Sequence, residues 1–137
     1  MVKASERAFS LTEIIIVLVI IAILALVGIP TYQYHVVKTH RSDGQLALLK
    51  LSSLLENYYL REHTYNGATL ARLGQAFNSP EGYYHLNIVL ENDGQRYQVQ
   101  AIPLGTQAAH DKACGTLQLS TDGRRTYLGT DPDANCW

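Results

Sequence analysis

The sequence is poor in the residue types that carry redox, metal and acid–base chemistry. Its 137 residues include two cysteines, one tryptophan and one methionine. The five histidines lie without the spacing of a ligand set, and two cysteines are too few for a metal site. A Ser/His/Asp, Cys/His or paired-carboxylate constellation is also lacking. These absences predict a protein that is not an enzyme and has no cofactor or metal.

The chain also has little net charge, internal repetition or low-complexity sequence. Its 11 Lys and Arg residues face 12 Asp and Glu residues, which gives a formal net charge of −1. A protein with this balance has no global electrostatic attraction to nucleic acid or to anionic lipid. Any charged partner must therefore be recognised through a local surface.

Polar side chains are absent from residues 14–29. The apolar run extends from Phe9 to Ile29 and is closed by Pro30. As a helix it is about 31 Å long, enough to cross the hydrocarbon core of a bilayer. Lys3 and Arg7 precede the run, which favours a cytoplasmic N-terminus and an exported C-terminus.

A secretory signal peptide and a plain signal anchor are the first alternatives for this run. Residues 25–29 offer only a poor Ala-x-Ala cleavage site. Neither alternative explains Phe-Ser-Leu-Thr-Glu at residues 9–13. A carboxylate inside a membrane costs roughly 2.5–3.5 kcal/mol on insertion scales, so its retention indicates that Glu13 has a function.

Both cysteines, Cys114 and Cys136, fall in the part predicted to be exported. An even number of cysteines outside the cytoplasm indicates one disulfide. The loop that it closes is expected to contribute on the order of 3 kcal/mol to stability.

Residues up to about Glu62 favour a helix, and Pro30 is expected to kink it without ending it. The polar residues 31–45 predict a neck between membrane and domain, with Gly44 as a weak point. Helical spacing defines an apolar stripe of Leu48, Leu51, Leu55, Tyr58 and Tyr59. Four more leucines are expected to widen the stripe and to be covered, namely Leu46, Leu49, Leu54 and Leu60.

Residues 63–82 contain loop signals, and four predicted strands follow. Alternating apolar residues place these strands at 84–90, about 95–102, 116–120 and 124–128. Asn92-Asp93-Gly94 forms the first hairpin turn, and residues 103–114 are expected to form a loop. The fold class is therefore α+β, with a long N-terminal helix on a four-stranded antiparallel sheet.

These residues resemble a known family. A basic leader, a small residue, Phe-Ser-Leu-Thr-Glu and an apolar run ending at Pro30 are similar to the class III signal of type IV pilins. The order of the elements and the C-terminal disulfide resemble a type IV pilin over the whole chain. Short stretches resemble the PilE-like minor pilins of type IVa systems, at residues 64–65, 79–84, 114–117 and 136–137.

The resemblance implies a processing event and a division of the chain. Residues 1–8 would be a leader that a prepilin peptidase removes between Ala8 and Phe9, with methylation of the new Phe9 amine. The family usually has glycine where this chain has Ala8. Residues 9–30 would be the transmembrane and filament-core helix, 31–62 its continuation on the sheet, and 63–137 the αβ-loop, sheet and disulfide-bounded region.

The implied function is that of a structural subunit, a minor pilin, of a type IV pilus. Glu13 would pair with the Phe9 amine of a neighbouring subunit, the alternatives being a pair within one helix or a protonated Glu13. Pro30 would be the second assembly residue. Implied partners are other pilin subunits, the prepilin peptidase, the inner-membrane assembly platform and the membrane lipid. The implied location is the inner membrane of a Gram-negative bacterium, with a periplasmic C-terminal domain, and then the extracellular filament.

Two other functions remain open at this stage. A pilin that binds DNA or an adhesin would use a basic set formed by Lys112, Arg124 and Arg125, although neighbouring aspartates favour a solvated strand face. A type II secretion pseudopilin would use Asp131-Pro132-Asp133 as a calcium loop, but calcium requires six to eight oxygens. Whether the pilus serves twitching, adhesion or DNA uptake also stays open.

Overall fold

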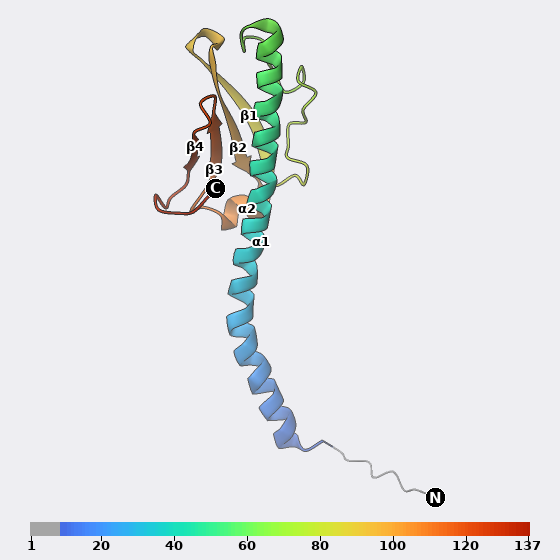
Figure 1. The fold of residues 1–137 in the computed structure, drawn as a ribbon. Helices are drawn as coiled ribbons and strands as arrows, with labels where there is room; N and C mark the ends of the chain where they lie inside the picture. Colours follow the sequence, from blue (N-terminus) through green and yellow to red (C-terminus); the bar gives the residue numbers. More distant parts are fainter. Residues whose placement is uncertain (1–8) are drawn as a thin grey trace, which may run out of the picture. The chain divides into compact units, whose positions relative to one another are not determined.

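The structure is a computed structural model that describes residues 9–137 (Figure 1). The chain divides into two compact units: the first ends at Val36, and the second spans Val37–Trp137. The elements are α1 (Leu11–Glu62), β1 (Tyr84–Glu91), the 3-10 turn η1 (Asn92–Gly94), β2 (Arg96–Pro103), α2 (Gly105–His110), β3 (Thr116–Ser120) and β4 (Arg125–Leu128).

Helix α1 continues through Pro30, as the sequence predicts. Side chains from Ile14 to Ile29 are all apolar and all exposed. The helix is thus long and apolar enough to cross a membrane by itself.

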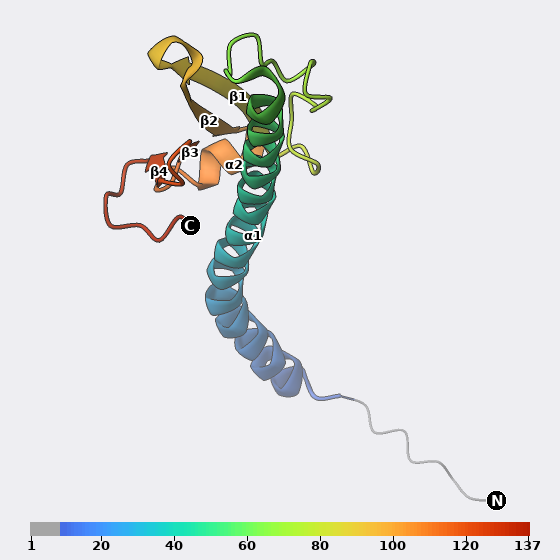
Figure 2. The same cartoon turned by 45° about the horizontal axis from the view of Figure 1, so that its top comes forward.

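In the second unit, α1 lies along one face of a sheet with strand order β1-β2-β3-β4 (Figures 1 and 2). All neighbouring strands are antiparallel, and the register pairs Leu86 with Ala101 and Val99 with Leu119. The side chains on this face pack against the apolar stripe of α1 and form the core. The predicted α+β class and antiparallel sheet are confirmed.

The predicted stripe is correct in its centre and wrong in its width. Leu48, Leu51 and Leu55 are fully buried. By contrast, Leu46, Leu49 and Leu60 are 66%, 43% and 73% exposed. The sheet covers only one side of α1 within Val37–Trp137, so leucines outside the stripe face away from the core.

The predicted neck is also wrong for its C-terminal part, since Asp43 and Gly44 are buried. A Cβ atom on Gly44 would lie 2.9 Å from Cδ2 of the fully buried Tyr84. Gly44 is therefore the residue that lets the Tyr84 ring approach the helix, and its low helix propensity is offset by this packing.

Two further boundaries differ from expectation. The predicted loop 103–114 contains the short helix α2, whose Gln107 is 1% exposed. Pro103 and Gly105 indicate a loop, but contacts of Gln107 Nε2 with the Val37 carbonyl oxygen and the Tyr84 hydroxyl hold a helical segment there. Strand β4 begins at Arg125, so Arg124 lies in the turn before it. The expected hairpin turn is confirmed, with positive φ at Asn92, Asp93 and Gly94.

Candidate functional site

The structure does not bring the predicted basic set together. The register pairs Leu119 with Arg125 at one end of the β3–β4 pair and Thr116 with Leu128 at the other. Arg124 lies beyond the first end. Lys112 lies at the second, where its carbonyl oxygen accepts hydrogen bonds from the backbone N–H and the hydroxyl of Thr130 at 2.9 and 3.1 Å.

Arg125 is engaged by the C-terminal tail. Its guanidinium carbon lies 5.5 Å from the centre of the Trp137 ring, within the range of a cation–π contact. The Trp137 Nε1–H donates to the Thr126 carbonyl oxygen at 2.9 Å. Because Arg125 pairs with the buried Leu119, it lies on the core side of the sheet rather than on the outer face.

A different pair of cations meets at the turn between β3 and β4. The Asp122 Oδ2 atom lies 3.4 Å from Arg96 Nη2 and 3.3 Å from Arg124 Nη2. The side chains of Arg96 and Arg124 are 51% and 72% exposed, so these ion pairs add little to stability. We call Arg96, Asp122 and Arg124 the arginine cluster.

Arg96 was missed by the sequence analysis because 26 residues separate it from Asp122. Only the pairing of β2 with β3, which places Gln98 opposite Ser120, brings the two positions together. An arginine near the start of the strand predicted at about 95–102 is the one signal that points to it.

The outer face of the sheet carries a line of uncharged polar side chains, four amides and one hydroxyl. Register aligns Asn87, Gln100, Gln118 and Thr126 across all four strands, and Gln98 lies two residues from Gln100 on β2. Hydrogen bonds of 3.1 to 3.2 Å join them into one network that we call the amide row.

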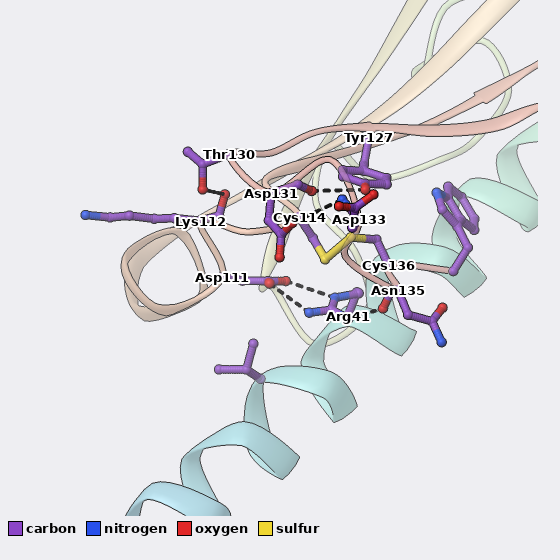
Figure 3. Close-up of a disulfide and its surroundings, with 12 residues drawn as sticks. Arg41, Asp111, Lys112, Cys114, Tyr127, Thr130, Asp131, Asp133, Asn135 and Cys136 are labelled. Carbon is purple, nitrogen blue, oxygen red and sulfur yellow. Dashed lines mark hydrogen bonds and ion pairs between the residues drawn. A yellow bond between two sulfur atoms is a disulfide. The ribbon is translucent and has the colours of Figure 1, made fainter.

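The disulfide expected from the sequence joins Cys114 and Cys136, with their Cα atoms 5.6 Å apart (Figure 3). The tail that it holds lacks regular structure, and side chains bind its carbonyl groups. Arg41 Nη1 donates to Asn135 at 3.0 Å, and Gln45 Nε2 donates to Cys136 at 2.9 Å. The Tyr127 hydroxyl lies 3.0 and 2.7 Å from the carbonyl oxygens of the Asp131-Pro132 pair.

Beneath the disulfide, Arg41 of α1 forms a bidentate ion pair with Asp111 (Figure 3). The distances are 3.0 Å from Nε and 2.8 Å from Nη2, and the side chains are only 11% and 2% exposed. Gln107 Nε2 donates to Asp111 and lies 2.9 Å from the Tyr84 hydroxyl oxygen. Burial raises the pKa of Tyr84 to about 12. The network is structural, since it ties α1 to α2 and the tail.

The suggested calcium loop has its own internal hydrogen bond. Asp131 Oδ1 accepts from the backbone N–H of Asp133 at 3.0 Å, which makes a local turn. Within residues 9–137, no group of three or more His, Cys, Asp or Glu side chains is placed to hold a metal ion.

Comparison with known proteins places the chain in a family. A model described as "Type IV minor pilin ComP, DNA uptake sequence receptor" matches residues 30–118. A model of the prokaryotic N-terminal methylation motif matches residues 3–29. The chain belongs to the ComP family of type IV minor pilins. The predicted membership of the type IV pilins, as a minor pilin, is therefore confirmed.

Solved pilins share the fold of this ComP-family chain. A type IV pilin from Shewanella oneidensis is 29% identical, with a TM-score of 0.56 over 74% of this chain and 97% of that one. The non-core minor pilin PilV of Neisseria meningitidis is 20% identical, with a TM-score of 0.57 over 74% and 94%. The second likeness shows the fold alone. The chain has no match among functionally curated proteins.

Proposed function

We propose that this minor pilin contributes DNA binding to a type IV pilus, with the arginine cluster contacting phosphates. The observation that carries the proposal is the convergence of two exposed guanidinium groups, from β2 and from the β3–β4 turn, on one carboxylate. Phosphate contacts supply most of the affinity for DNA, and guanidinium groups bind phosphate in a bidentate manner. The family's description as a DNA uptake sequence receptor supports the same function.

The sequence favours a solvated strand face for Lys112, Arg124 and Arg125, a set that shares only Arg124 with the arginine cluster. Lys112 lies at the far end of the strand pair, and Arg125 lies against Trp137. Arg96 and Arg124 instead share Asp122, whose side chain is 37% exposed. Glu91 lies opposite Arg96 in the β1–β2 pair, so two carboxylates neighbour the two arginines, and DNA phosphates would compete with Asp122 and Glu91 for them.

Replacing both Arg96 and Arg124 by alanine is expected to weaken DNA binding. It should also reduce the slope of log K against log salt concentration by the equivalent of about two phosphate contacts. Asp122→Asn is expected to strengthen binding, because it removes the competing charge while the side-chain oxygen still accepts from the backbone N–H of Arg124. Fluorescence anisotropy of a labelled duplex with full-length protein in detergent, at several salt concentrations, measures both effects.

Lys50→Ala is the matched control, since Lys50 is an exposed cation on α1 away from the arginine cluster. It should leave the affinity and its salt dependence close to those of the wild-type protein. An unchanged salt dependence in the Arg96→Ala/Arg124→Ala variant would contradict the proposed site.

We further propose that the chain is processed and inserted as the family resemblance implies. A prepilin peptidase would cut between Ala8, outside the described residues, and Phe9, which is 75% exposed just before α1. The methylation-motif match to residues 3–29 supports this. The proposed division of the mature chain is 9–30, 31–62 and 63–137. The domain would face the periplasm of a Gram-negative bacterium until the assembly platform adds the subunit to the filament.

The mature protein is expected to begin with N-methyl-Phe9. Intact-mass measurement and N-terminal peptide mapping of protein from its native membrane check this. Ala8→Gly, which introduces the residue usual in the family, should be processed at least as completely. A mature N-terminus at Met1 or Val2 would contradict the proposed processing.

Glu13 is proposed to pair with the Phe9 amine of a neighbouring subunit. It lies in the first turn of α1, exposed, and in the single chain it makes no ion pair with any side chain among residues 9–137. Charges that meet in a low-dielectric filament core attract strongly. Pro30 is proposed as the second assembly residue, at the end of the apolar segment.

Glu13→Gln is expected to leave the amount of pilin in the membrane unchanged and to remove most of it from sheared filaments. The lost charge abolishes the attraction to the amine, but the apolar helix still inserts. Immunoblots of the membrane and sheared fractions measure the ratio, with Glu13→Asp as the charge-retaining control. Wild-type incorporation of Glu13→Gln would refute the role of the charge.

A further inference from the structure

The amide row is a polar feature of the domain that neither the core nor the arginine cluster uses. Its members lie on the outer face of all four strands, on the side of the sheet away from Leu86, Val99 and Leu117. No member carries a charge. Side chains on a solvated sheet face need no mutual hydrogen bonds, yet these five form one connected network.

The hydrogen bonds determine which atom each amide presents to solvent. Gln98 Oε1 accepts from Gln100 Nε2 at 3.1 Å and from Gln118 Nε2 at 3.2 Å. Within residues 9–137 the Gln98 Nε2 group has no acceptor of its own. Asn87 donates through Nδ2 to Gln100 at 3.2 Å, and among the same residues its Oδ1 has no donor. The row thus offers a donor at Gln98 and an acceptor at Asn87 in fixed orientation.

Burial separates Gln118 from the other members of the amide row. Asn87, Gln98 and Gln100 are half-buried, so their amides are reachable from solvent. Gln118 is only 7% exposed, and its Oε1 accepts from the Thr126 hydroxyl at 3.1 Å. Gln118 is therefore a positioning residue that holds the Gln98 amide, and Thr126 in turn orients Gln118 through its hydroxyl. Such preorganisation lowers the entropic cost of binding.

The row continues directly from the arginine cluster. Arg96 and Gln98 are two residues apart on β2 and therefore share the outer face, about 7 Å from one another along the strand. A ligand that places phosphates on Arg96 and Arg124 would run past the amides. Strands are known to enter DNA grooves, where Asn and Gln pair with the donors and acceptors of base edges.

We propose that the amide row reads base edges of double-stranded DNA whose phosphates lie on the arginine cluster. Asn87, Gln98 and Gln100 would contact the bases, and Gln118 and Thr126 would position them. The inference rests on the proposed DNA binding and adds to it the source of sequence preference. Phosphate contacts position a duplex without reporting its sequence, so the arginines alone cannot supply that preference.

The test is selection from a random-sequence duplex library with full-length protein in detergent. The wild-type protein should enrich a motif. Asn87→Ala/Gln98→Ala should keep its affinity for bulk library DNA and lose about tenfold or more of the preference for that motif over a scrambled duplex. Thr116→Ala, a change on the outer face but outside the row, should enrich the wild-type motif. Gln118→Met tests positioning and should weaken the preference without abolishing binding.

Each outcome separates this inference from the function on which it rests. If the Asn87→Ala/Gln98→Ala variant enriches the wild-type motif and prefers it as strongly as the wild-type protein does, the inference is overturned while the proposed DNA binding still stands. Wild-type binding without any enriched motif does the same. A wild-type protein that binds no duplex overturns both. Fluorescence of Trp137, the single tryptophan, shows whether each variant is folded.

Discussion

Replacing Arg41 by methionine is expected to lower the free energy of unfolding by about 3–5 kcal/mol. The Asp111 side chain is 2% exposed, and the variant would leave its carboxylate buried without its cation. The Asn135 carbonyl would also lose its donor. Urea titration of the full-length protein in detergent, followed by fluorescence of Trp137, measures the change.

Two variants distinguish the buried ion pair from a general effect of charge or helix surface. Lys38→Met makes the same kind of change at an exposed position one turn earlier on α1, and it should cost little. Arg41→Met/Asp111→Leu removes both charges and should recover part of the loss, because no unpaired carboxylate remains. A loss below about 1 kcal/mol for Arg41→Met would show that Asp111 does not depend on the ion pair.

Replacing both cysteines by alanine is expected to cost about 3 kcal/mol. The disulfide spans a sequence separation of 22 residues, so its removal restores considerable freedom to the unfolded chain. In the folded domain, the freed tail would still be held by side-chain donors to its carbonyl groups and by the contacts of Trp137 with Arg125 and Thr126. The same urea titration gives the magnitude.

Dithiothreitol provides the internal control for the disulfide. It should shift the wild-type midpoint toward that of Cys114→Ala/Cys136→Ala and should leave the double variant unchanged. Combining this variant with Arg41→Met should give less than the sum of the two losses, since Arg41 binds the residue next to Cys136. A wild-type midpoint that is insensitive to complete reduction would contradict the role assigned to the bond.

The elements that depend on local pattern were predictable. Alternation from Tyr84 to Leu90 reports a strand because successive side chains point to opposite faces. Leu48, Leu51 and Leu55 recur at helical spacing and are buried as expected. The long helix also continued through Pro30, since proline is tolerated where neighbouring turns preserve the helix.

Local patterns give the wrong prediction where burial depends on which surfaces of the folded domain meet. Leu46 and Leu49 are as apolar as Leu48, and only the position of the sheet leaves them exposed. Gly44 has a low helix propensity, yet it makes room for Tyr84, 40 positions later in the chain. Helix α2 is short, and the buried hydrogen bonds of Gln107 support it where local propensity did not indicate a helix.

The residues of the candidate site also depend on the fold. Proximity in the sequence groups Lys112, Arg124 and Arg125, whereas strand pairing separates Lys112 from the other two and brings Arg96 and Arg124 to the same carboxylate. The amide row likewise exists only through cross-strand register, because its members come from four different strands.

Local composition and periodicity are enough to predict the apolar helix, the importance of Glu13, the disulfide cysteines and the order of the strands. The folded domain is needed to show which leucines are buried, how Arg41 and Asp111 pair, and which cations and amides form one surface. The physical reason is that these features depend on contacts between residues far apart in the chain, whose register is set by the packing of the whole domain.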